Sequence, residues 1–474
     1  MRTATSTAPT PARRGSSALR WSGLAAFALA GGLLVSACAG GASPAPEATP
    51  AERASLPATP SGTPSATGPI AIRTLDDLQL VLRQIAAARS ADAQARADEL
   101  WKVLVRDHGV PVVLGHDVLF VYKGEAEQVE WRGSFNGWGA PGLAGSRVGV
   151  TDLWIGYLKL PAASRVEYKI VLDGETWLVD PANPATAYSG LTGVNNVVTL
   201  PDFTVTDESR ERSGVTPGTL TGDLSIASRQ LGYTVDYWVY LPAGYDELER
   251  LPVLYVLDGN DFVDGRMGAL PTVLDNMIAS GRVQPLIVVF TDAREPGDPH
   301  HNRREDEFLS HPVEHARFIA DELVPAIDGA YRTDPDAGAR AIAGVSYGGL
   351  AATFIAASRP AVFHGLAAFS PSLWVVDSPQ YLADEQQAAG ARRMQPALDA
   401  VTTCGSDADS ACAPIRIFLG AGIPDWDVGD FSSLVRVLER QGYSVDFHQV
   451  REGHTWAQWR GLADEMLVFL FGAD

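Results

Sequence analysis

One segment, residues 340–350, constrains the fold of this chain more than any other. The apolar run 341–343 predicts a buried strand, and the apolar residues that follow the segment's glycines predict a helix. Between them Ser346 stands at the centre of a G-x-S-x-G motif. A serine on so tight a turn needs neighbours without a Cβ two residues away, and Gly344 and Gly348 meet that demand. The segment predicts a strand–turn–helix unit that exposes Ser346 as a candidate nucleophile.

Length and charge narrow the class of protein. The chain has 474 residues and 46% apolar content, enough for two or three globular domains. Its formal net charge of −20 argues against a nucleic-acid partner, because the phosphates would be repelled. No basic patch beyond the extreme N-terminus offsets this repulsion.

The N-terminus reads as an export signal. Four arginines precede or border an apolar run at residues 24–35, which is too short to span a bilayer comfortably. The run ends at Val35-Ser-Ala-Cys38, which resembles the lipobox of bacterial lipoproteins. We therefore expect residues 1–37 to be a signal peptide and a lipid on Cys38 to anchor the protein to the outer side of the cell membrane. The alternative is ordinary cleavage near the same position and secretion without a lipid.

Two segments follow that differ sharply in composition. Residues 38–69 are rich in Pro, Ala, Ser and Thr, which predicts an extended tether without a core. Residues 70–110 place leucines at helical spacing, which predicts a short helical segment.

Only two cysteines remain after Cys38, and they stand close together at Cys404 and Cys412. In an exported protein such a pair predicts a disulfide, with two free surface thiols as the alternative. The chain lacks a Cys/His quartet at ligand spacing, which argues against zinc. The polar run 298–306, with nearby histidines, also matches no ligand motif and is expected to form a loop over the cleft. We expect no metal and no cofactor.

Residues 111–205 alternate apolar and polar side chains in short runs between Gly, Pro and Asn turns, which predicts a small β-sandwich. Two tryptophan-containing stretches, 131–138 and 177–184, resemble early-set immunoglobulin-like modules related to glycogen-binding domains. Trp131, Trp138 and Trp177 are expected mainly as core and turn residues, with a sugar-stacking platform as the alternative.

The pattern changes again in residues 222–474, where short apolar strands alternate with helices. Such alternation predicts a mostly parallel sheet with helices on both faces. Eight strands are expected, with Ser346 directly after the fifth, which is the order of an α/β-hydrolase fold. The expected strands are 224–229, 233–241, 252–257, 286–290, 340–343, 366–369, 415–419 and 445–450.

Serine needs a general base and a carboxylate that orients it, and in α/β-hydrolases these follow in the order serine, acid, histidine. His454 lies just past the last expected strand, which makes it the candidate base among nine histidines. The acid should follow the strand before, where Asp425 is preferred and Asp427 and Asp430 remain alternatives.

The oxyanion donors should be backbone N–H groups. One belongs to the residue after the nucleophile, Tyr347, and the other should come from the loop after the third strand, at Gly259 or Asn260. The substrate pocket is expected to include Trp374, from the stretch 370–374, and Trp456, from the helix that follows His454. Arg303 and its neighbour Arg304 could meet an anionic substrate or lie on the solvated surface.

Taken together, six motifs resemble those of the esterase family that contains enterochelin esterases, esterase D, feruloyl esterases and mycolyltransferases. The resemblance covers nearly all of residues 222–474 and, with the sandwich ahead of it, the layout is most similar to enterochelin esterases. It implies Ser346, Asp425 and His454 as the triad; Pro424 before the acid departs from the pattern. The matching stretches are 254–259, 322–325, 343–350, 369–374, 421–425 and 453–460.

The resemblance implies a serine carboxylic-ester hydrolase that forms an acyl-enzyme on a small-molecule or glycan-linked ester, a siderophore lactone being one candidate. A feruloyl or acetyl esterase acting on polysaccharide, an acyltransferase and an inactive binding lipoprotein are the alternatives. The loops that form a substrate pocket follow no sequence pattern that identifies a ligand, so the sequence does not identify the ester.

Overall fold

The computed structural model describes residues 69–473, apart from 191–192, 205, 207, 404–413 and 424–430. The expected signal peptide and tether lie outside the described residues, as do Cys38, the cysteine pair and all three candidate acids. Among the residues that are described, no helix is both long and apolar enough to cross a membrane.

The described chain begins with two helices, α1 (Leu75–Ala87) and α2 (Ser90–Asp107). Helix α1 starts in a capping box: the Thr74 hydroxyl accepts from the Asp77 N–H at 3.2 Å, and the Asp77 carboxylate accepts from the Thr74 N–H at 2.9 Å. The apolar sides of both helices share one core with the strands that follow.

Those strands form two antiparallel sheets, a four-stranded one ordered β1-β2-β6-β5 and a six-stranded one ordered β4-β3-β7-β10-β9, with β8 paired to β7. The strands of the first are β1 (Val112–Leu114), β2 (Asp117–Lys123), β5 (Ser146–Arg147) and β6 (Leu153–Lys159). The strands of the second are β3 (Val129–Gly133), β4 (Leu143–Ala144), β7 (Arg165–Leu172), β8 (Thr176–Leu178), β9 (Thr186–Tyr188) and β10 (Val194–Thr199).

The two sheets share an apolar core, and the helix pair covers the outer face of the four-stranded sheet. Trp131 is fully buried in the shared core, with its ring 5.8 Å from that of Phe120. Trp177, by contrast, is 44% exposed, and the Arg132 guanidinium lies 5.4 Å from its ring centre. The expectation of core packing therefore holds for Trp131 and fails for Trp177, which β8 turns outward.

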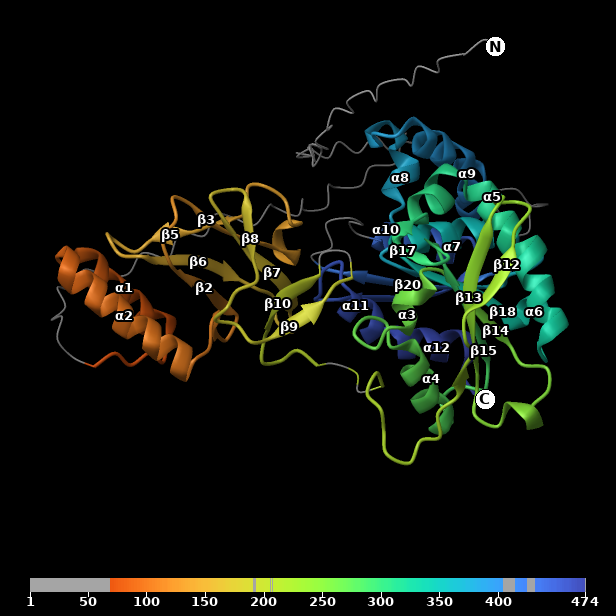
Figure 1. Ribbon diagram of the computed structural model, residues 1–474, viewed down its shortest axis with the longest axis horizontal. Coiled ribbons are helices and arrows are strands. Elements are labelled where there is room, and N and C mark those ends of the chain that lie inside the picture. Colours follow the sequence, from red (N-terminus) through yellow and green to blue (C-terminus); the bar gives the residue numbers. More distant parts are fainter. Residues whose placement is uncertain are drawn as a thin grey trace, which may run out of the picture. The chain divides into compact units, whose positions relative to one another are not determined.

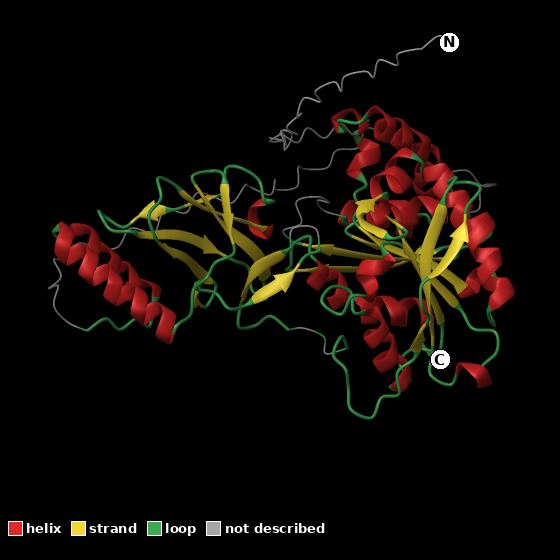
Figure 2. Cartoon of the chain, in the orientation of Figure 1, coloured by secondary structure: helices red, strands yellow, loops and turns green. Residues whose placement is uncertain are grey.

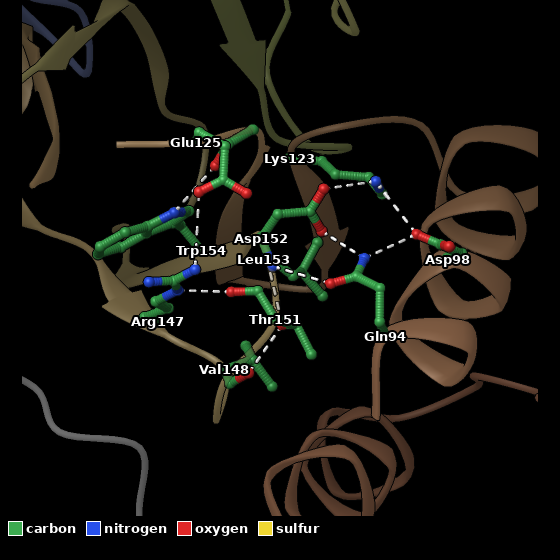
Figure 3. A network of polar contacts seen from close by, with 11 residues as sticks. Gln94, Asp98, Lys123, Glu125, Arg147, Val148, Thr151, Asp152, Leu153 and Trp154 are labelled. Atoms are coloured by element: carbon green, nitrogen blue, oxygen red, sulfur yellow. Dashed lines mark hydrogen bonds and ion pairs between the residues drawn. The ribbon is translucent and has the colours of Figure 1, made fainter. Parts of the chain in front are cut away.

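A polar network fixes α2 to the sandwich (Figure 3). The Gln94 amide donates to one oxygen of Asp152 at 2.7 Å, and Lys123 donates to the other at 2.7 Å. Lys123 also reaches Asp98 at 3.1 Å, so that two residues of α2 and two of the sandwich form one connected set. The Lys123 ammonium and the Gln94 amide together hold the pKa of Asp152 below its usual range, although partial burial acts in the opposite direction.

The C-terminal part is built on a nine-stranded sheet ordered β11-β13-β15-β14-β18-β19-β20-β21, with β12 paired to β13 (Figure 1). Strands β15, β14, β18, β19, β20 and β21 pair in parallel with one another, while β11, β12 and β13 pair antiparallel. This is the α/β-hydrolase fold, and all eight predicted strands are present. The strands are β11 (Thr219–Leu220), β12 (Leu224–Ala227), β13 (Thr234–Leu241), β14 (Val253–Val256), β15 (Ile287–Asp292), β18 (Arg340–Val345), β19 (Gly365–Phe369), β20 (Arg416–Gly422) and β21 (Ser444–Val450).

Helices cover both faces of this sheet and create a separate apolar core on each (Figure 2). One face carries α3 (Gly259–Val263), α4 (Leu270–Ala279), α11 (Trp456–Gly461) and α12 (Ala463–Phe471). The other carries α5 (Pro312–Arg317), α6 (Val324–Ala330), α7 (Tyr347–Ser358), α8 (Trp374–Asp377), α9 (Glu385–Thr403) and α10 (Ser432–Arg440).

Shorter elements complete the chain. Strands β16 (Arg294–Glu295) and β17 (Asp298–Asn302) form a hairpin. Single 3-10 turns lie at η1 (Ser134–Asn136), η2 (Tyr245–Glu247), η5 (Ala337–Ala339) and η6 (Pro379–Tyr381), and wider π turns at η3 (Asp306–Ser310) and η4 (Phe318–Leu323).

Candidate active site

Ser346 occupies the turn between β18 and α7 in a strained backbone conformation, with φ 55° and ψ −122°. Non-glycine residues rarely adopt a positive φ, and residues held there cluster at functional sites. The Ser346 N–H donates to the Phe369 carbonyl at 2.9 Å, and its own carbonyl accepts from the Leu350 N–H at 3.0 Å. The neighbouring strand and the first turn of α7 thus hold the strained residue in place.

The two glycines of the motif have the steric role that the sequence predicted. A Cβ on Gly344 would lie 2.3 Å from the Gly348 carbonyl oxygen, within the same turn. A Cβ on Gly348 would lie 2.5 Å from an oxygen of Asp258, in the loop after β14. The second glycine therefore makes room for the carboxylate of another loop.

His454 lies in the loop between β21 and α11, as predicted. The edge of its ring meets the Trp459 indole, with ring centres 5.0 Å apart and planes at 88°. Thr455 caps α11 by accepting from the Gln458 N–H. The start of this helix therefore sets where the imidazole lies.

A buried amide joins the loops at the ends of three neighbouring strands. Gln458 is fully buried and, with its amide oriented so that both ends find partners, donates to the Gly453 carbonyl at 2.7 Å and accepts from the Gly422 N–H at 3.1 Å. It also contacts the Ser370 hydroxyl, which accepts from the Trp459 indole at 3.2 Å. The segments after β19, β20 and β21 are thus connected through one side chain, which the sequence analysis did not identify.

Further contacts connect the segment of Ser370 with Ser346. Ser372, two residues after Ser370, has its hydroxyl 3.4 Å from that of Ser346, and its N–H donates to the Ser346 carbonyl at 3.2 Å. On the acid side, the Ile423 N–H donates to the Val450 carbonyl at 2.7 Å. The last described residue before the candidate acids therefore lies beside the strand that leads to His454.

The loop after β14, which the sequence predicts to supply an oxyanion donor, begins with a second strained residue. Asp258 has φ 55° and ψ 36°, and Gly259 opens α3 directly after it. A Cβ on Gly259 would lie 2.6 Å from the Phe290 backbone, so only glycine fits there. The Asn260 side chain donates to Asp261 at 2.5 Å. Burial, and then the nearby Asp258, raise the pKa of Asp261 to about 7.

The expected pocket residues are placed as follows. Trp456 is buried with its ring against Phe262, 5.2 Å between centres, and Trp374 opens α8 a short way after Ser370. Arg303 lies over the Tyr233 ring at 4.1 Å. Arg304 pairs with Asp258 at 2.7 Å, and its side chain is 23% exposed. The pocket roles of Trp374, Trp456 and Arg303 stay predictions.

The loop of His454 also contacts the sandwich. The Arg165 side chain donates to Glu452 at 3.2 Å, and the Arg165 N–H donates to the Arg451 carbonyl at 2.9 Å. Both Arg165 and Glu452 are almost fully buried. Burial raises the pKa of Glu452 to about 7, although Arg165 opposes that shift.

Residues 228–470 match the family model described as "Putative esterase", which is about half of the chain. The chain belongs to this esterase family. Two curated relatives of this chain are an endo-1,4-beta-xylanase/feruloyl esterase of Xylanibacter ruminicola, 35% identical over 26% of this chain, and an iron(III) enterobactin esterase of Dickeya dadantii, 28% identical over 53% of it. The chain spans only 18% and 55% of these two proteins, respectively.

Solved structures show the same fold. The ferric enterobactin esterase of Salmonella typhimurium aligns over 79% of this chain and 98% of its own, with a TM-score of 0.59 and 19% identity. The enterobactin esterase of Shigella flexneri aligns over 75% and 92%, with a TM-score of 0.57 and 18% identity. Each alignment covers more of this chain than the half that the family model matches. Both therefore extend beyond residues 228–470.

Proposed function

We propose that this protein is a serine carboxylic-ester hydrolase with Ser346 as nucleophile, His454 as general base and Asp425 as the acid that orients it. One observation carries the proposal: Ser346 is held at a positive φ between a buried strand and a helix, with the candidate base on the loop three strands further along the sheet. Such strain persists only where surrounding structure enforces it, and it is typical of a nucleophile elbow.

In the proposed reaction the Ser346 oxygen attacks the ester carbonyl while the imidazole of His454 takes the hydroxyl proton. The carbonyl oxygen becomes an oxyanion that accepts from the N–H of Tyr347 and from an N–H at Gly259 or Asn260. The C–O bond then breaks, and the imidazolium returns the proton to the departing alcohol. Water, deprotonated by the same imidazole, attacks the acyl-enzyme and releases the acid and free Ser346.

The test uses p-nitrophenyl acetate turnover and labelling by a fluorophosphonate. Ser346→Ala should lower kcat at least about 10³-fold and abolish the label, with the circular dichroism spectrum unchanged. The matched control is Ser358→Ala, at the other end of α7, which should keep both turnover and label. Activity and labelling that survive Ser346→Ala would end the proposal.

For the substrate we favour a polyester of an aromatic acyl amino acid, the chemistry of the siderophore lactone enterobactin. Support comes from the aligned enterobactin esterases, whose similarity covers more of the chain than the catalytic sheet alone. We also propose residues 111–205 as an immunoglobulin-like module of the same layout. A feruloyl ester on polysaccharide is the second candidate, favoured by the relative that combines xylanase and feruloyl esterase.

A substrate panel separates the two candidates. Enterobactin with and without iron(III), feruloylated xylo-oligosaccharide and p-nitrophenyl acetate are compared by kcat/KM. The first candidate requires enterobactin to exceed the feruloyl sugar by at least about tenfold, and the reverse order would favour the second.

We further propose that the protein is anchored outside the cytoplasm by lipid on Cys38, on the basis of the N-terminal sequence pattern. Metabolic labelling with a fatty acid should mark the protein in bacterial membranes, and Cys38→Ser should remove both the label and the membrane association. A mature N-terminus at another residue would overturn this assignment.

A further inference from the structure

Arg304 holds together two segments of the site, yet the mechanism proposed above gives it no role. Its Nε donates to Oδ1 of Asp258 at 2.7 Å and its Nη2 to Oδ2 at 2.9 Å, which is a bidentate pair. The same Nη2 donates to the Val345 carbonyl at 3.0 Å. One guanidinium therefore connects the loop of the expected oxyanion donor with the residue immediately before Ser346.

The two segments that it connects are in direct contact. The Asp258 carboxylate lies so close to the elbow that a Cβ on Gly348 would be 2.5 Å from its Oδ2. Asp258 itself is held in the left-handed region, with φ 55°, and Gly259 follows it at once. The backbone N–H groups expected to bind the oxyanion therefore follow directly after the residue that Arg304 holds.

The charge of Asp258 has a second consequence. Its side chain is only 6% exposed, so an unpaired carboxylate there would be poorly solvated and would repel a negative charge forming nearby. Arg304 supplies the opposite charge at hydrogen-bond distance. Its position is fixed further by two rings, Tyr347 at 5.3 Å and Phe308 at 5.5 Å from the guanidinium carbon.

We propose that Arg304 is a positioning residue for the oxyanion hole: it locks the Asp258 loop against the nucleophile elbow and neutralises the carboxylate beside the developing oxyanion. The inference rests on the proposed serine mechanism. It predicts an effect on transition-state stabilisation, and so on kcat, with substrate affinity nearly unchanged.

The main test replaces the guanidinium. In Arg304→Gln the carboxylate loses its partner, and kcat for p-nitrophenyl acetate should fall about 100-fold, the size seen when one oxyanion donor is lost, while KM changes less than about threefold. The rate of fluorophosphonate labelling at Ser346 should fall in parallel. Adding Asp258→Asn removes the unpaired charge, so the double variant should regain at least about tenfold of the lost kcat.

Two further variants separate positioning from general stability. Arg304→Lys keeps the charge but cannot form the bidentate pair, and should lose about tenfold in kcat. Arg340→Gln removes another buried arginine, paired with Asp328 at 2.5 Å, at the opposite end of β18. It should lower the melting temperature without changing kcat more than twofold.

The outcomes are distinct. Arg304→Gln with kcat within twofold of wild type, or an equal fall in kcat for Arg340→Gln, would overturn the inference. If Arg304→Gln does not fold, the lysine variant decides: kcat within twofold of wild type overturns the inference, and a tenfold loss at unchanged KM supports it. Wild-type protein whose Ser346 takes no fluorophosphonate would instead refute the serine mechanism, and with it this role of Arg304.

Discussion

A methyl group at position 344 has no space in this fold. The carbonyl oxygen that it would meet, 2.3 Å away, belongs to Gly348 in the turn's own backbone, which cannot move without releasing Ser346. The positive φ of Ser346 and the absence of a side chain at Gly344 therefore belong to the same turn and depend on each other. At the scale of single residues, the site therefore depends on the missing Cβ atoms of its glycines as much as on the side chains that are present.

Gln458 gives the residue-scale prediction. Gln458→Leu leaves the Gly453 carbonyl and the Gly422 N–H buried without the amide that now pairs them. We expect the free energy of unfolding to fall by about 2–4 kcal/mol and kcat to fall about tenfold, because the loop of His454 loses an anchor. Urea unfolding and p-nitrophenyl acetate kinetics measure both. Gln386→Leu, an exposed glutamine of α9, is the control, and equal behaviour of the two variants would contradict the role of Gln458.

At the scale of elements, periodicity and turn residues were sufficient to predict the eight long strands of the central sheet and the strand–turn–helix around Ser346. Strand β11 was missed because two residues show no alternation. Arg304 and Asp258 are 46 residues apart, and Gln458 and Ser370 are 88 apart. Such pairs depend on how the chain folds back, so no local pattern reveals them. The position of Ser346 could be predicted, and its supporting side chains could not.

The network between α2 and the sandwich gives the element-scale prediction (Figure 3). Asp152→Ala removes the acceptor shared by Gln94 and Lys123, so the free energy of unfolding should fall by about 1–2 kcal/mol. Esterase activity should not change, because this network lies within the N-terminal segment and the sandwich. Asp107→Ala, at an exposed ion pair with Arg106, should have no measurable effect in the same urea titration. A stable Asp152→Ala would show that the helix pair is held by its apolar core alone.

At the scale of the whole molecule, buried titratable groups make stability depend on pH. Burial raises the pKa of Glu307 to about 8, although the Tyr233 hydroxyl and the charge of Arg303 oppose the shift. Burial also lowers the pKa of His315 to about 3; its Nε2 lies 3.7 Å from Glu307. Asp306 and Asp258 add negative charge nearby.

Glu307 and His315 change the free energy of unfolding with pH in opposite directions. Between about pH 4.5 and 6.5 the unfolded chain protonates the histidine and the folded chain protonates Glu307, so the two contributions oppose each other. Above about pH 6.5 the histidine no longer contributes, while Glu307 still binds a proton more tightly in the folded state, so its contribution to stability is lost as the pH rises through about 8.

Glu307→Gln should therefore flatten the decline in the free energy of unfolding between pH 6.5 and 8.5, measured by urea titration at several pH values. Glu305→Gln, at an exposed neighbour, should leave the decline as in wild type. A decline in Glu307→Gln as steep as that of the wild type would contradict the assignment.

The helix pair at the start of the described chain has one more effect. Helices α1 and α2 cover the outer face of the four-stranded sheet, so that face is not available as a flat binding surface. On the opposite sheet, the Trp177 indole is turned to solvent beside Arg132. A molecule that binds this module through a broad sheet surface therefore has to bind somewhere other than the side that α1 and α2 cover.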